Sequence, residues 1–344
     1  MDSLQISLLV AGGATLLAVV LYNQWVSRRS APRQAEELEP AVDVDTPDVT
    51  DEAPVEPVME DDFRNLPQPE RKPVLDKLVD VISIVEVDQP VSGDAALAAL
   101  PATRRVGTKP FHVEGCSELS GEWEPLLPGR RYSAFQAGVQ LANRMGPLNE
   151  IEFSEFVVKT QAFADAVGGT PGIHEMLEEV ARARELDQFA SAHDAQLSFT
   201  LLARAAAWSP GFVHQHAARL GFVAGVIPGR MVLPSSVQGL PPVLSLTFDA
   251  QAAMADDPAL SAVRECTLSL DVPQVPRGDQ PYERLCQAAQ MLVEQMDGVI
   301  SDGSGQILGP EVMQQIGLDL EQLYDALDSR GLDAGSPQAR RLFS

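Results

Sequence analysis

Residues 263–302 read VRECTLSLDVPQVPRGDQPYERLCQAAQMLVEQMDGVISD, and this stretch decides the fold of the C-terminal half of the chain. Its first part, 264–273, alternates apolar and polar residues as a half-buried strand does. The next part, 282–298, repeats apolar residues at helical spacing and ends at Gly298. A further strand follows and turns at SDGSG (301–305). The succession of strand, helix and hairpin predicts a domain that combines a sheet with helices.

Similar patterns extend outward from this stretch in both directions. Strand-like patterns cover 79–87, 104–115, 130–144, 195–205 and 231–250, and helical patterns cover 93–100, 150–169, 173–190, 210–222 and 310–331. Two units, 74–190 and 195–331, therefore share an order of strand, helix, strands and helix, which predicts an internal duplication. The predicted fold class is α+β of the split βαβ type, with an antiparallel sheet covered on one face by helices. Residues 332–344 are predicted to be a flexible tail.

Residues 4–26, LQISLLVAGGATLLAVVLYNQWV, contain no charged side chain. At about 1.5 Å per residue, a helix of this length spans a hydrocarbon core of roughly 30 Å. Tyr22 and Trp25 lie where interfacial aromatic residues are common. The segment is predicted to be a transmembrane helix.

The main alternative for this segment is a cleaved signal peptide, which carries positive charge before its apolar run. Here Asp2 precedes the run, and Arg28, Arg29 and Arg33 follow it. The positive-inside rule then favours an uncleaved single-pass anchor, with the N-terminus outside and the C-terminal domain in the cytoplasm.

Residues 27–73 are predicted to be a basic flank followed by a disordered linker rich in acidic residues and proline. Apolar residues occur singly there, so the segment cannot bury a core, and its like charges repel one another. We expect a self-repelling spacer with a span of about 50–100 Å.

The formal net charge of −24 argues against binding to nucleic acid, because the phosphate backbone repels an acidic chain. Three scattered cysteines, Cys116, Cys266 and Cys286, lack CxxC spacing and indicate buried thiols in a reducing compartment.

The residues from about 197 to 330 resemble the C-terminal domain of the ZipA family, bacterial cell-division proteins that bind the tubulin-like FtsZ. The similarity is carried by ARLGFVAG (218–225), by the block 263–302 and by GPEVMQQIGLDLEQL (309–323). The layout of anchor, short basic flank, acidic linker and C-terminal domain is also similar. The segment 75–187 resembles the same domain more faintly, and a second unit is a departure from the family.

The resemblance implies that the C-terminal tail of FtsZ lies on an apolar sheet face that the helices leave uncovered. Such binding needs side chains at alternate strand positions. The positions that correspond to this partner-binding face are Arg204, Ile227, Phe248, Ala250, Thr267 and Ser269. Arg204 and Ser269 stand where the family has larger apolar residues, which makes the face more polar here. An ordinary core position is the alternative for Phe248, and Leu244, Leu246, Leu268 and Leu270 share a phase that faces the helices.

No catalytic, cofactor-binding or metal-binding residues are predicted. His214 and His216 lie at i and i+2 on different sides of a helix, so they are predicted to be surface histidines rather than a metal pair. SDGSG lacks the Lys-Ser/Thr of a phosphate loop, and the chain has no GxSxG motif.

The favoured interpretation is therefore a cell-division adaptor of the bacterial inner membrane, not an enzyme, that binds FtsZ and tethers the Z-ring during septum formation. No small-molecule substrate is expected. The first alternative is a structural adaptor for a different division or envelope partner, with the first unit as binder and the second as dimer contact. A membrane-anchored hydrolase is the second alternative, and it would need a polar cleft with convergent titratable groups.

Overall fold

The computed structural model describes residues 32–35 and 74–344, apart from 238, 256 and 258–260. These residues form two units: an N-terminal unit that ends at residue 192, and a C-terminal unit made of 193–343 together with 32–35. The predicted anchor, 4–26, and the predicted linker, apart from 32–35, lie outside the described residues. In the part of the chain that the structure covers, no helix has the length and apolar character needed to cross a membrane.

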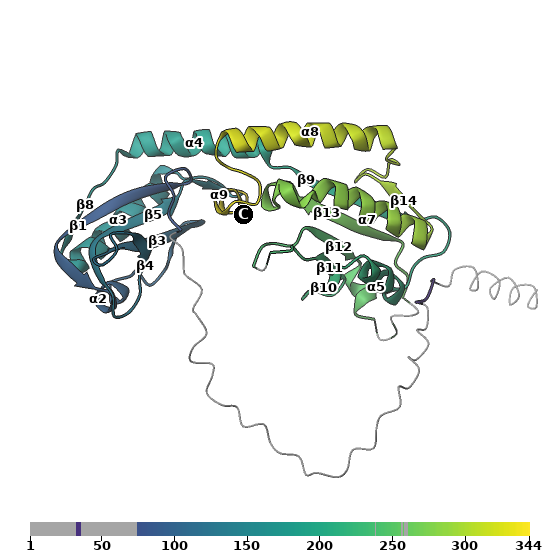
Figure 1. Ribbon diagram of the computed structural model, residues 1–344, viewed down its shortest axis with the longest axis horizontal. Helices are drawn as coiled ribbons and strands as arrows, with labels where there is room; N and C mark the ends of the chain where they lie inside the picture. Colours follow the sequence, from purple (N-terminus) through teal and green to yellow (C-terminus); the bar gives the residue numbers. More distant parts are fainter. Residues whose placement is uncertain (1–31, 36–73, 238, 256, 258–260) are drawn as a thin grey trace, which may run out of the picture. The chain divides into compact units, whose positions relative to one another are not determined.

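The N-terminal unit is an antiparallel sheet with helices (Figure 1). In chain order its elements are β1 (Asp80–Ser92), α2 (Gly93–Ala98), β2 (Arg105–Val106), β3 (Lys109–Ser117), β4 (Trp123–Pro125), β5 (Arg131–Gln140), β6 (Ala142–Asn143), β7 (Gly146–Pro147), α3 (Glu150–Val167), β8 (Gly169–Pro171) and α4 (Met176–His193). The strand order is β2-β3-β5-β1-β8, with β4 paired to β3 and a separate β6-β7 hairpin.

Local sequence explains the bounds of α3. Asn149 caps its first turn and forms a reciprocal capping box with Glu152, and Gly168 ends it in the left-handed conformation. The buried face of α3 carries Phe163, whose ring packs edge-on against Phe135 of β5 at 5.3 Å between centroids. This contact lies in the core of the N-terminal unit.

The C-terminal unit has the same general character. Its elements are β9 (Gln196–Ala203), α5 (Pro210–Arg219), β10 (Val223–Ala224), β11 (Arg230–Leu233), β12 (Leu244–Phe248), α6 (Ala250–Ala253), β13 (Glu265–Asp271), the 3-10 turns η2 (Val272–Gln274) and η3 (Arg277–Asp279), α7 (Pro281–Met296), β14 (Gly298–Ser301), α8 (Pro310–Ser329) and α9 (Pro337–Leu342). The strand order is β10-β11-β12-β13-β9-β14, and every pair is antiparallel. The predicted α+β class with antiparallel sheets is confirmed.

One face of this second sheet is covered by helices. α7 contacts β9, β13 and β14, and α5 contacts α7 and β10. Leu244 and Leu246 of β12 and Leu268 and Leu270 of β13 are buried, as their shared phase predicts.

The two units share a connectivity. In each sheet, the first strand lies between the last strand of that sheet before the long helix and the strand that follows the helix. In the N-terminal unit β1 lies between β5 and β8, and in the C-terminal unit β9 lies between β13 and β14. A further strand, β3 or β12, extends the sheet beyond β5 or β13. The sheets therefore have corresponding cores, although their edge strands differ.

The last residues of the chain do not form the predicted flexible tail. Ser336 caps α9, Pro337 starts it, and Leu342 is buried. Gln274 Nε2 donates to the carbonyl oxygens of Arg340 at 3.2 Å and Phe343 at 2.7 Å, which attaches this helix to η2. The prediction failed because α9, although short and partly charged, is held in place by its buried apolar side chains and by these hydrogen bonds.

Candidate protein-binding surface

The sheet face of the C-terminal unit opposite α5 and α7, here called the open face, is dominated by hydroxyl side chains. Cross-strand register aligns Thr247, Thr267 and Thr200 in one row. Ser245, Ser269 and Ser198 form a second row. The Thr247 hydroxyl donates to the Thr267 carbonyl at 3.4 Å, and the Ser269 hydroxyl donates to the Ser245 carbonyl at 3.4 Å. The centre of the open face is consequently more polar than a face made of aliphatic side chains.

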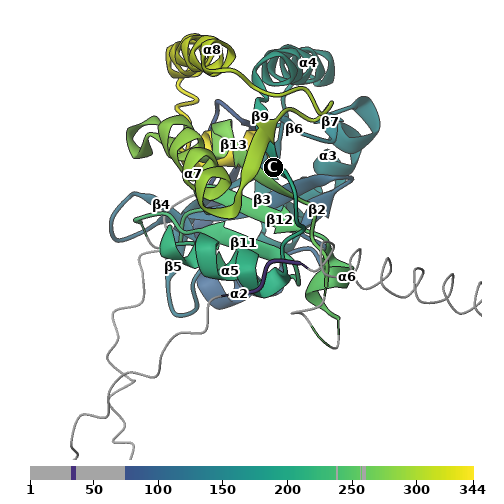
Figure 2. The same cartoon turned by 90° about the vertical axis from the view of Figure 1, so that its right-hand side faces the viewer.

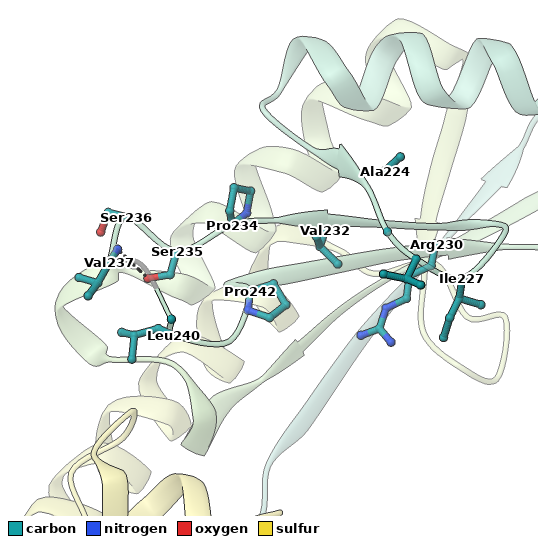
Figure 3. A pocket seen from close by; sticks show the side chains of 13 residues that line it. Ala224, Ile227, Arg230, Val232, Pro234, Ser235, Ser236, Val237, Leu240 and Pro242 are labelled. Carbon is teal, nitrogen blue, oxygen red and sulfur yellow. Dashed lines mark hydrogen bonds between the residues drawn. The ribbon is translucent and has the colours of Figure 1, made fainter. Parts of the chain in front are cut away.

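Both rows lead to an apolar groove at the β11 side of the sheet (Figure 3). Arg230 continues the threonine row and Val232 continues the serine row. Their neighbours Met231 and Leu233 are buried on the helix side, so alternation directs Arg230 and Val232 to the open side.

The groove has a volume of about 680 Å³ and is walled by the β10–β11 and β11–β12 connections. Its described lining residues are Ala224, Gly225, Val226, Ile227, Arg230, Val232, Pro234, Ser235, Ser236, Val237, Gly239, Leu240 and Pro242. Ile227 and Val237 are each 56% exposed, and Val226 is fully exposed. Such a cluster of exposed aliphatic side chains is typical of a protein-interaction site.

Arg230 is the charged member of the described lining. Its Nη2 donates to Ser245 Oγ at 3.2 Å, whereas its Nε is buried and, within the described residues, has no hydrogen-bond partner. A guanidinium beside apolar walls fits a carboxylate, because Arg donates several hydrogen bonds in a planar fork that matches a carboxylate.

The turn before Arg230 depends on glycine. Gly229 has φ +74°, and a Cβ there would lie 2.5 Å from the carbonyl oxygen of Phe248. The Phe248 amide donates to the Gly229 carbonyl at 2.9 Å, which fixes the turn to the end of β12. This close approach positions Arg230 at the start of β11.

The six residues predicted to bind a partner do not form one surface. Thr267 and Ser269 lie on the open face and Ile227 lines the groove, so these three share one side of the unit. Ala250 is exposed at the start of α6, outside the groove. Arg204 follows β9, where its Nε donates to the Gly298 carbonyl at 3.1 Å.

Phe248 lies on the opposite, helix-covered side. It pairs in register with buried Cys266, is 9% exposed, and packs edge-on against His214 at 5.6 Å between ring centroids. Its phase matches that of Leu244 and Leu246, so the period of the strand places it in the core.

The sequence pattern did not indicate Arg230, Val232 and Val237. Two sequence signals could have indicated the groove. One is the alternation of apolar and polar residues in RMVL (230–233), and the other is the loop PSSVQGLPP (234–242), where apolar residues stand among proline and serine.

His216 differs from the predicted surface histidine. It is 6% exposed, and its Nδ1 hydrogen-bonds with Gln295 Oε1 at 3.0 Å between α5 and α7. Among the described residues, no group of three or more His, Cys, Asp or Glu is arranged to hold a metal ion. Burial raises the pKa of the Cys266 thiol to about 12, so that thiol stays protonated at neutral pH.

No protein-family model matches this chain, and a search of curated proteins found no match either.

Proposed function

We propose that this protein is a membrane-anchored adaptor of bacterial cell division, with the groove and open face of its C-terminal unit binding the C-terminal tail of FtsZ. The observation that carries the proposal is the apolar groove with Arg230 on its floor, continuous with the sheet rows that contain Thr267 and Ser269. An extended peptide lying on a sheet face and filling apolar pockets with alternate side chains is a recurrent mode of recognition.

The groove also favours binding over catalysis. Its described lining has one charged side chain, Arg230, and otherwise consists of aliphatic residues, glycine, proline and serine. Hydrolysis by acid–base chemistry needs convergent titratable groups, which this lining does not provide.

We also propose that the two units are copies of one split βαβ module of the ZipA type, which their shared connectivity supports. The groove distinguishes the units in function, because it lies in the C-terminal one. Residues 4–26 would hold the inner membrane, with both units in the cytoplasm.

Affinity through such a shallow site is expected to be modest. FtsZ filaments present many tails, and many adaptors lie in one membrane, so multivalency raises the effective affinity. The function is therefore the tethering of a filament by many weak contacts.

The test is a pull-down of FtsZ, full-length and lacking its C-terminal tail, by the full-length protein in lipid nanodiscs. We expect retention of the full-length form alone. Equal retention of the tail-less form would refute the groove as its site. If neither form is retained, FtsZ is not the partner, and the alternative of a different division or envelope partner replaces it.

Two variants locate the contact. Val226→Asp places a charge on a fully exposed groove residue, and Leu318→Asp makes the same change on α8, where Leu318 is 54% exposed. We expect the first to abolish retention of FtsZ and the second to leave it unchanged. Equal effects of the two variants would contradict a specific groove.

A further inference from the structure

A segment from the start of the chain is bound to the C-terminal unit as an additional strand. Residues 32–35 lie beside α5, as the purple segment in Figures 1 and 2 shows. The Arg33 amide donates to the Ala207 carbonyl at 2.7 Å, and the Ser209 amide donates to the Arg33 carbonyl at 2.8 Å. These two bonds form a parallel bridge between Arg33 and Trp208.

Trp208 is paired on its other side as well. Its amide and carbonyl exchange hydrogen bonds of 2.8 Å with Val263 in an antiparallel bridge. Arg33, Trp208 and Val263 thus make a small three-stranded arrangement, with Trp208 fully buried at its centre. Ala207 and Ser209 are each 1% exposed. Without Arg33, the Ala207 carbonyl and the Ser209 amide would lose these hydrogen bonds, and unpaired main-chain groups in a buried setting are unfavourable.

The Arg33 side chain reaches the C-terminal end of α7. Its Nη1 donates to the Met296 carbonyl at 3.2 Å, and its Nη2 forms an ion pair with Asp297 Oδ2 at 2.7 Å. The indole Nε1 of Trp208 donates to the same Met296 carbonyl at 2.7 Å. The last carbonyls of a helix lack partners within the helix and carry partial negative charge, so a guanidinium is a favourable ligand there.

We propose that residues 32–35 are a docking strand, with Arg33 as its anchor point, that binds the C-terminal unit in cis and holds it close to the membrane. The membrane part of this inference rests on the proposed function of residues 4–26. Position 33 is seven residues after position 26, a reach of at most about 25 Å in an extended chain.

With the docking strand bound, the acidic segment no longer lies between the membrane anchor and the C-terminal unit. Residues 36–73 run from the docking strand to the N-terminal unit, which is inserted in the chain between two parts of the C-terminal unit. The acidic segment therefore does not set the distance between the membrane and the groove, because the C-terminal unit stays beside the anchor. A filament captured by the groove would lie near the bilayer.

A disulfide tests the docking directly in the full-length chain. A Cβ built on Gly211, at the start of α5, lies 3.9 Å from the Ala35 Cβ, within the range of about 3.5–4.5 Å that disulfides require. Both positions are exposed, and Gly211 has no positive φ that would strain a cysteine. Ala35→Cys/Gly211→Cys should cross-link rapidly under mild oxidation, identified by peptide mapping.

The matched control is Ala35→Cys/Gly278→Cys, since Gly278 is exposed on the same unit with no atom within 4 Å of an added Cβ. We expect at least tenfold slower cross-linking in the control. Adding Arg33→Glu to the first pair should slow its cross-linking several-fold, because a carboxylate would face Asp297. Equal rates for the two pairs would overturn the docking strand, and this readout involves neither FtsZ nor a membrane.

The proximity of the C-terminal unit to the membrane is tested separately, by energy transfer. A fluorophore on Ser304→Cys, in the exposed turn after β14, is placed in the full-length protein in vesicles with headgroup acceptors. We expect energy transfer that falls in the Arg33→Glu variant. Cross-linking without any energy transfer would keep the docking strand and overturn the membrane anchor. Equal transfer in both variants would show that docking does not hold the C-terminal unit near the bilayer.

Discussion

Truncation of Ile227 should weaken partner binding without unfolding the protein. Ile227 lines the groove with 56% of its surface exposed. Complete burial of an isoleucine is worth about 1.5–3 kcal/mol, so burying the exposed half under a bound peptide contributes about 0.8–1.5 kcal/mol. Ile227→Ala should remove most of that contribution, which raises the Kd for a peptide of the FtsZ tail about three- to tenfold.

The assay is fluorescence anisotropy of the labelled tail peptide, titrated with the full-length protein in nanodiscs. Leu318→Ala on α8 is the control, since Leu318 is 54% exposed and lies outside the groove. The urea midpoint of each variant should match that of the parent, because each side chain is largely in water already. Equal loss of affinity in the two variants, or no loss in Ile227→Ala, would show that the peptide does not bury Ile227.

Two further predictions concern stability. Gly229→Ala should lower the free energy of unfolding by at least ~2 kcal/mol, since it combines a left-handed φ with a Cβ 2.5 Å from the Phe248 carbonyl oxygen. The control is Gly239→Ala, at φ +86° with no atom within 4 Å of an added Cβ, which should lose less stability in urea unfolding. Equal losses in the two variants would rule out the close contact at Gly229. Burial lowers the pKa of His214 below its ordinary 6.5, so the unfolded chain binds the proton more readily than the folded one. The free energy of unfolding therefore falls as the pH drops below about 6.5. His214→Gln should reduce that fall between pH 7 and 5, and an unchanged pH profile would exclude His214 as a cause.

Helices and strands were predictable because their signals are local. The apolar period of 282–298 predicted α7 to within two residues at each end, although Asp297 rather than Gly298 takes the left-handed position at its end. The buried phase of β12 was equally visible. Phe248 was nevertheless assigned to the open face through the resemblance, against its own strand period.

The long-range contacts could not be predicted from local patterns. Arg33 and Asp297 are separated by 264 positions, and Arg204 and Gly298 by 94. No spacing rule indicates which arginine will complete the end of a distant helix. The groove depends on two connections folding over one edge of the sheet, so its walls are a tertiary feature. By contrast, Ser336 and Pro337 form a recognisable helix start, and the last helix was within reach of the sequence.

Site-specific photo-cross-linking tests whether the groove holds the tail of FtsZ. A benzophenone amino acid replaces Val237, which is 56% exposed in the groove, or Leu318 on α8 as the matched control, in the full-length membrane-embedded protein. If the groove binds this tail, we expect an adduct between position 237 and the C-terminal tail of FtsZ and none from position 318. Adducts from position 318 alone, or from position 237 to FtsZ lacking its tail, would show that the groove does not bind the tail.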